Sequence, residues 1–212
     1  GMKVVFAQSD FQFADKAIPL VKRVANRLGM AKMLTSVMID VIDHGSPASR
    51  NPADSIEVYS NGGVRLHLRY DDFLKPQYHG DPRRRDPRSS LPARAFDQKS
   101  TMELLYRLLL QWRDVQAWGI PENHDEQFLC VWNVHVAGRL DRLDAPVAPK
   151  TAYWEEFLRV FSHGEYVSPF LVLFEVLWKC DDLGKWGLTD VLYRVRSSRQ
   201  YRPLVAEKQE TR

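Results

Sequence analysis

A short hairpin signal constrains the fold of this chain more than any other feature. Two runs in which apolar and polar residues alternate, residues 55–60 and 64–69, flank the turn Asn61-Gly62-Gly63. Alternation with a period of two is typical of a half-buried strand, and Asn-Gly favours the tight turn of an antiparallel pair. The sequence therefore predicts a β-hairpin. The apolar side chains expected on its buried face are Ile56, Val58, Val64, Leu66 and Leu68.

The regions around the hairpin predict the remaining elements. Residues 17–28 carry apolar residues at helical spacing, and residues 33–42 are rich in β-branched residues typical of a strand. The later part of the chain predicts helices at 100–118, at 123–143, from 151, at 168–179 and a short one at 189–195. We expect an α+β fold, with an N-terminal helix and a small sheet containing the hairpin, followed by a mostly helical C-terminal half packed on it. No linker divides the chain, so residues 2–212 are expected to form a single domain.

Polar residues predict where two of the later helices begin. Ser100 with Glu103 matches a capping box, in which the two side chains bond each other's backbone N–H groups. Asn123 with Glu126 matches the same pattern. These residues are therefore the expected N-terminal caps.

Two segments show no periodic pattern. Residues 76–98 contain four prolines and five arginines, and long loops of this kind in folded domains are either functional or mobile. We expect a flexible arginine-rich loop there. The last segment, residues 203–212, is expected to be a disordered tail.

The net charge of +3 is the balance of three opposed segments. Residues 81–94 carry a net +3 and residues 193–212 a net +4, whereas residues 119–165 carry a net −4. Clustered charge says more about partners than a total does. The two basic segments are candidate sites for an anionic partner. Their arginines are Arg83, Arg84, Arg85, Arg88 and Arg94, then Arg194, Arg196, Arg199 and Arg202.

Three kinds of contact are open to these arginines. Tyr193 and Tyr201 lie among the later ones, and arginine beside aromatic rings suits single-stranded nucleic acid. However, Asp81 and Asp86 reduce the net positive charge of the first cluster, and the sequence contains no motif of a common nucleic-acid-binding module. The acidic segment 119–165 could instead dock on either cluster, within one chain or across a dimer, or the loop could be solvated. We therefore place a protein partner or self-association ahead of nucleic acid.

A search for catalytic and cofactor motifs gives negative results. The chain has no G-x-G-x-x-G, no phosphate-binding G-x-x-x-x-G-K-[ST] and no G-x-S-x-G. Its six histidines include no pair at i, i+4, which is the local spacing that holds zinc on a helix. The sequence accordingly predicts neither a metal nor a cofactor.

Two polar residues in apolar helical surroundings are the remaining site candidates. Glu175 is the only charge between Phe170 and Trp178, so it is either an acid with a raised pKa or one partner of an ion pair. His135 shares a predicted helical face with Val131, and is either a functional group or a structural residue bonded to a backbone carbonyl.

The order of helix, strand, hairpin and central apolar helix over residues 15–145 resembles the minimal scaffold of zincin-type metallopeptidases. In that family the central helix carries H-E-x-x-H, whose histidines hold zinc and whose glutamate acts as the base. Here Tyr106 and Leu110 stand at the histidine positions and Arg107 at the glutamate position. Leucine cannot ligate zinc and arginine cannot act as a base. The resemblance thus implies a degenerate, non-catalytic relative, with His135 where a third ligand would be sought.

The combined observations predict a non-enzymatic interaction protein on this degenerate scaffold, soluble, cytoplasmic and bacterial in type. Two cysteines without a C-x-x-C pair indicate no disulfide framework, and no apolar run reaches the ~18 residues of a membrane helix. Two alternatives stay open. One is a nucleic-acid-binding protein that uses the arginines at 83–94 and 194–202. The other is a hydrolase with an unrecognised site near Glu175 or His135.

Overall fold

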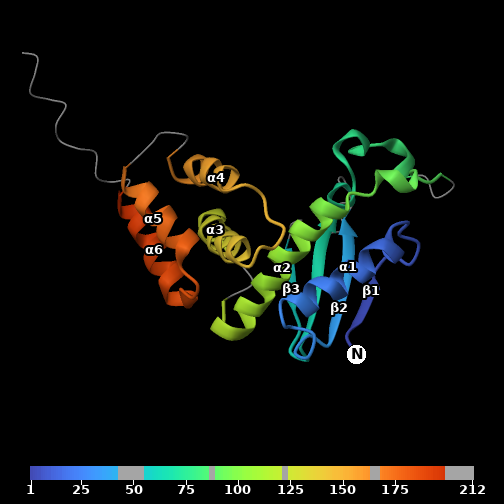
Figure 1. The fold of residues 1–212 in the computed structure, drawn as a ribbon, viewed down its shortest axis with the longest axis horizontal. Coiled ribbons are helices and arrows are strands. Elements are labelled where there is room, and N and C mark those ends of the chain that lie inside the picture. The colour runs from blue at the N-terminus through green and yellow to red at the C-terminus, as the bar shows by residue number, and fades with distance from the viewer. Residues whose placement is uncertain (43–54, 86–88, 121–123, 163–167, 199–212) are drawn as a thin grey trace, which may run out of the picture. The chain divides into compact units, whose positions relative to one another are not determined.

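The chain has an α+β fold in the computed structural model, as the sequence predicts. The structure describes residues 1–42, 55–85, 89–120, 124–162 and 168–198. Within them a four-stranded mixed sheet lies in the N-terminal part, together with two of six α-helices (Figure 1). The chain divides into two compact units, although its sequence shows no boundary. Unit 1 comprises residues 1–122 and 144–147, and unit 2 comprises residues 123–143 and 148–212.

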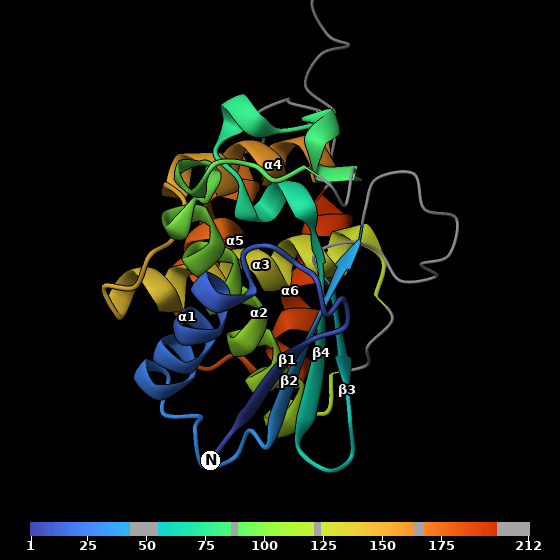
Figure 2. The same ribbon diagram turned by 90° about the vertical axis from the view of Figure 1, so that its right-hand side faces the viewer.

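The sheet of unit 1 has the strand order β1-β2-β4-β3 (Figure 2). Strands β1, β2 and β4 are parallel, and the edge strand β3 is antiparallel to β4. The strands are β1 (Lys3–Phe6), β2 (Ser36–Ile42), β3 (Ser55–Val58) and β4 (Gly63–Arg69). The hairpin prediction is confirmed, and so is a strand within residues 33–42. The sequence analysis did not predict β1, since four residues are too few for alternation to show.

The hairpin turn depends on its two glycines. Gly62 has a φ of 80°, a left-handed conformation that costs glycine little. Asn61 accepts a hydrogen bond from the Gly63 N–H at 3.0 Å, which fixes the turn locally. The next strand buries Val64, Leu66 and Leu68, as predicted, whereas Ile56 and Val58 are half-buried. The edge position of β3 explains this difference.

Helices α1 (Ala14–Arg27) and α2 (Gln98–Trp118) lie on one face of the sheet (Figure 2). The apolar stripe of α1 is fully or almost fully buried, as its helical spacing predicts. The predicted capping box is wrong, because Asp97 is the N-cap of α2 and accepts a hydrogen bond from the Ser100 N–H at 3.1 Å. Three residues earlier, the Asp97 carboxylate, like a serine hydroxyl, offers an oxygen that accepts from the backbone N–H groups of the first turn. Gly119, in a left-handed conformation, ends the helix as expected.

All regular secondary structure in the described part of unit 2 is α-helical. It consists of α3 (Glu126–Arg142), α4 (Lys150–Ser162), α5 (Ser168–Lys179) and α6 (Gly184–Ser198). Helix α3 contacts each of the other three (Figure 1). Its N-cap is Asp125, whose side chain accepts from the Phe128 N–H at 2.7 Å, so the prediction of Asn123 is wrong. The last helix starts five residues earlier than the predicted span 189–195 and ends three residues later.

Helices α3 and α5 cross closely because of one glycine. A Cβ atom at Gly138 would overlap the carbonyl oxygen of Trp178. The absence of a side chain therefore lets the two helix backbones meet. No helix within the described ranges is both long and apolar enough to span a bilayer. The predicted tail, residues 203–212, lies outside those ranges.

Candidate functional site

The arginine-rich segment of unit 1 has its two ends joined. Leu74 forms an isolated antiparallel bridge with Phe96, and the Lys75 N–H donates to the Ala95 carbonyl at 2.9 Å. Three short 3-10 helices occupy part of the intervening chain: η2 (Pro76–Tyr78), η3 (Pro82–Arg85) and η4 (Ala93–Ala95). The joined ends and the short helices give the described part of this segment local structure of its own. The flexible-loop prediction thus falls on a segment with much local structure.

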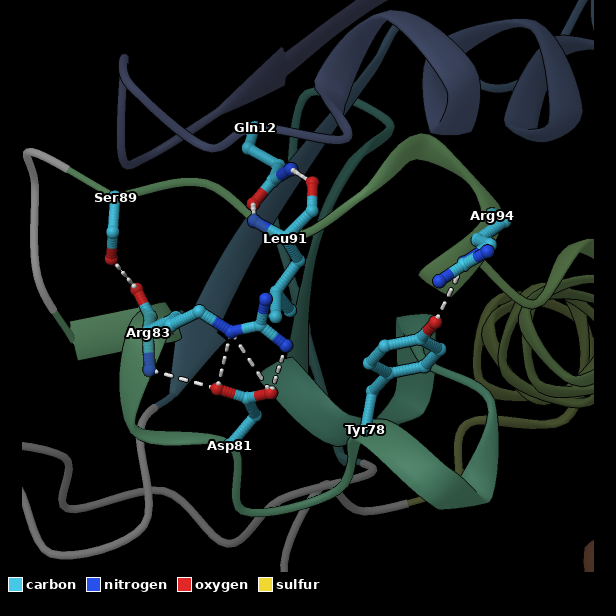
Figure 3. Close-up of polar contacts among 7 residues, drawn as sticks. All are labelled: Gln12, Tyr78, Asp81, Arg83, Ser89, Leu91 and Arg94. Carbon is cyan, nitrogen blue, oxygen red and sulfur yellow. Dashed lines mark hydrogen bonds and ion pairs between the residues drawn. The ribbon is translucent and has the colours of Figure 1, made fainter.

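One glutamine anchors this segment to the chain before α1 (Figure 3). The Gln12 side chain donates to the Leu91 carbonyl at 2.6 Å and accepts from the Leu91 N–H at 3.0 Å. Leu91 is itself buried, and the Lys16 ammonium donates to the Ala93 carbonyl at 2.7 Å. Side-chain bonds to backbone groups therefore replace the regular pairing that a strand would provide.

Three arginines of this segment, Arg83, Arg84 and Arg94, are paired with partners in the same unit. Arg83 bonds Asp81, with 2.6 Å between Nη2 and Oδ2, and these bonds lower the pKa of Asp81 to about 2 (Figure 3). Arg94 donates to the Tyr78 hydroxyl at 3.1 Å. The Arg84 side chain is 4% exposed and its Nη1 lies 2.5 Å from Asp71 Oδ1.

Of the remaining predicted cations in this cluster, Arg88 and the side chain of Arg85 lie outside the described part of the structure.

The C-terminal cluster shows the same behaviour in unit 2. Arg194 bonds Asp190 at 2.8 Å, and Arg196 bonds Asp125 at 2.7 Å. Asp125 belongs to the acidic segment, so that segment docks on the basic cluster within the chain at this residue. Arg199 and Arg202 lie outside the described residues.

The positions that correspond to the zincin motif lie on α2. Tyr106 and Leu110 are fully buried, and Arg107 is half-buried. The Tyr106 hydroxyl has no hydrogen-bond partner in the described structure, and the Arg27 guanidinium lies 6.0 Å from its ring centroid. The same described residues contain no group of three His, Cys, Asp or Glu side chains placed to hold a metal ion. The two buried positions contribute to the core of unit 1.

His135 has a structural contact at the end of α5. Its Nδ1 lies 3.1 Å from the Leu177 carbonyl, and its side chain is fully buried. Burial, with Arg139 adding to it, lowers its pKa to about 4. Arg142 donates to the carbonyls of Trp178 and Cys180. These bonds cap the C-terminus of α5. His135 is therefore neutral near pH 7 and helps to join α3 to α5.

Glu175 is held by two lysines rather than by apolar groups. Its carboxylate lies 2.5 Å from the Lys150 ammonium and 3.0 Å from that of Lys179. These contacts lower its pKa, which is the direction opposite to that of an acid kept protonated at neutral pH. The ion-pair alternative accounts for Glu175, and both of its partners are lysines.

A polar row on the other face of the sheet was missed by the sequence analysis. The buried His67 of β4 has Nδ1 3.4 Å from Asp40 and Nε2 3.5 Å from Glu57. Gln8 donates to Asp40 at 2.9 Å. The two ring nitrogens face different carboxylates, so the three groups do not converge on one point. The hairpin alternation places His67 and Glu57 on the face opposite the apolar one, which was the available signal.

An exposed apolar face on α5 is the second feature without a specific prediction. Leu171, Val172 and Val176 are 41%, 63% and 41% exposed. They line a shallow groove of about 540 Å³ together with Glu175, Lys179 and Cys180. The opposite side of the helix is buried through Phe170, Phe174 and Leu177. The sequence of α5 is apolar on nearly every face, which is the signal for a helix with two apolar contacts.

Comparisons with known proteins identify no relative. No family, no curated protein and no solved structure matches the chain.

Proposed function

We propose that the chain is a non-enzymatic interaction protein that self-associates through the exposed face of α5, with a degenerate zincin-type scaffold in unit 1. The observation that carries the proposal is the row Leu171, Val172 and Val176, which are 41–63% exposed on a helix whose other side is core. Contiguous apolar side chains on a surface, beside charged ones, are typical of protein contact sites.

A second copy of the chain fits the charges of this face. Glu175 and Lys179 lie beside the apolar row, 3.0 Å apart, with Lys150 next to them. In a dimer with two-fold symmetry the same patch meets itself. A patch that carries both signs can place each lysine near the carboxylate of the other copy. The apolar row then supplies the buried contact and the charges set its orientation.

The scaffold part of the proposal is supported by element order. Helix α1, strand β2, the β3–β4 hairpin and the apolar helix α2 follow one another in the order from which the resemblance was inferred. The three positions corresponding to H-E-x-x-H hold Tyr106, Arg107 and Leu110. Nucleic acid ranks behind protein as a partner, since five arginines already bond groups within their own unit. These are Arg83, Arg84, Arg94, Arg194 and Arg196.

Sedimentation velocity over a wide range of protein concentration tests self-association. We expect a monomer–dimer equilibrium that Val176→Lys shifts to monomer, because the lysine must lose its hydration to enter the contact. Thr189→Lys, which adds the same charge at an exposed position of α6, should leave the equilibrium unchanged. A monomer at every concentration would overturn the assignment of the α5 face.

Metal analysis tests the non-enzymatic part of the proposal. The purified protein should contain no stoichiometric zinc. Zinc at one equivalent per chain, together with a hydrolytic activity that chelation removes, would contradict it.

A further inference from the structure

A second hollow in unit 2 lies between α3 and α4 and has a different character from the α5 face. It is a cavity of about 290 Å³. Its apolar wall includes Leu129, Val134, Ala148 and Ala152, and Cys130 and Tyr153 also line it. Val134 and Cys130 are buried, whereas Leu129 is 36% exposed at the opening. The cavity is thus closed at one end and open at the other.

Its size fits a small organic molecule. A cavity of roughly 150 Å³ with apolar walls holds a benzene ring, and this one has about twice that volume. A fused two-ring system, or one ring with a short chain, would fill it. Such a ligand lies at the small end of the range for which proteins form pockets.

The charge at the opening of the cavity determines whether a cationic or an anionic ligand is attracted. Glu126 and Glu156 line the cavity and share a single guanidinium, that of Arg159, at 2.6 and 2.7 Å. Two carboxylates and one cation leave a net negative charge. This opening belongs to the acidic segment 119–165, whose net charge is −4. A cation is therefore attracted to it and an anion repelled.

The floor of the cavity carries no charge. Burial, with Glu156 adding to it, raises the pKa of the Cys130 thiol to about 12. The thiol is therefore protonated at neutral pH and acts as a small apolar surface rather than as a nucleophile.

We propose that this cavity binds a small amphiphilic amine, with its apolar body against Leu129, Val134 and Ala152 and its ammonium beside Glu126 and Glu156. The site is independent of self-association at α5. Burial of the apolar body provides the affinity, and the carboxylates determine which end of the ligand faces solvent.

Three indole compounds that differ in charge test the proposal. Tryptamine is a cation at pH 7, indole is neutral and indole-3-propionate is an anion. Isothermal titration at low salt should show saturable binding of tryptamine, weaker binding of indole, and indole-3-propionate weaker than tryptamine by about tenfold or more. Equal affinity for all three, or no saturable binding at millimolar concentration, would overturn the proposal.

Two pairs of variants locate the site. Ala152→Leu fills the cavity and should abolish tryptamine binding, whereas Thr151→Leu, which places the same side chain at the neighbouring exposed position, should not. Glu156→Gln should weaken tryptamine binding by up to about fivefold, whereas Glu155→Gln should leave it unchanged. Thermal unfolding confirms that each variant is folded. Tryptamine binding that survives Ala152→Leu in a folded protein would contradict the assignment.

Discussion

The two units differ in what they do with their apolar and charged side chains. Within the described residues, unit 1 has one large apolar side chain with high exposure, Met33, whereas unit 2 has seven. Those of unit 2 are Leu129, Leu143, Leu171, Val172, Val176, Trp186 and Tyr193. In unit 1 three arginines of the arginine-rich loop, Arg83, Arg84 and Arg94, bond Asp81, Asp71 and Tyr78 respectively. The exposed apolar surfaces suited to binding therefore lie in unit 2.

The largest expected effect separates the stabilities of the two units. Gly138→Ala places a methyl group against the Trp178 backbone, so α3 and α5 must move apart. We expect a loss of about 3 kcal/mol in the free energy of unfolding of unit 2, the upper end for overpacking. Hydrogen exchange, measured residue by residue as the temperature rises, should show this loss of stability in α3–α6 and not in the sheet. An equal loss in both units would show that they unfold together.

Acid should destabilise unit 2 through His135. Its pKa is about 4 when folded and about 6.5 when unfolded, so the unfolded state binds the proton more readily. Stability is therefore complete above pH 6.5 and falls as the pH approaches 4, by about 2 kcal/mol between pH 7 and pH 5. Denaturant titrations at several pH values measure this slope. His135→Gln should flatten it, and an unchanged slope in that variant would assign the effect to other groups.

In unit 1 the informative change is at the partner of a buried cation. Asp71→Asn leaves Arg84, 4% exposed at its side chain, beside a neutral amide. We expect unit 1 to lose about 1–2 kcal/mol of stability, since the buried guanidinium of Arg84 then loses the negative charge of Asp71. Asp81→Asn is the matched control, because its partner Arg83 is half exposed, and its effect should be much smaller. Chemical denaturation measures the stability of both variants. Equal losses would mean that the burial of Arg84 does not increase the contribution of its ion pair to stability.

The smallest expected effect concerns Tyr106 on α2, a fully buried residue. Tyr106→Phe removes a buried hydroxyl that has no hydrogen-bond partner in the described structure. Unit 1 should gain stability by up to about 1 kcal/mol, because the cost of burying that group disappears. A clear loss of stability, measured by thermal unfolding, would show that the hydroxyl has a role in the fold.

The sequence was most informative where structure depends on neighbours along the chain. The hairpin, helix α1 and the end of α2 at Gly119 follow from alternation, helical spacing and a left-handed glycine. Strand β1 was missed because its pairing with β2, Val4 with Val37 for example, depends on residues far apart in the chain. Both N-caps were misassigned because Ser100 and Asn123 compete with the nearby Asp97 and Asp125 for the same role.

The candidate sites depend even more than the fold on contacts between residues far apart in the chain, which the sequence does not show. A run of arginines predicts positive charge, but whether that charge is available depends on contacts such as Arg84 with Asp71, thirteen positions away. The cavity of unit 2 needs two helices in register, since Leu129 and Ala152 come from α3 and α4. The α5 face and the polar row at His67 did have local signals. A helix apolar on most sides must cover more than one surface, and the hairpin alternation places His67 and Glu57 on one face.

The short segment 144–147 limits how the protein can be divided. The chain leaves unit 1 after residue 122, returns to it for these four residues and then leaves again. In unit 1, Arg27 donates to the Asp144 carbonyl at 2.6 Å. A truncation at residue 122 would therefore remove a piece of unit 1 along with unit 2. No single cut isolates both intact units, so a genetic fusion or a fragment study needs a design that keeps this segment with the sheet.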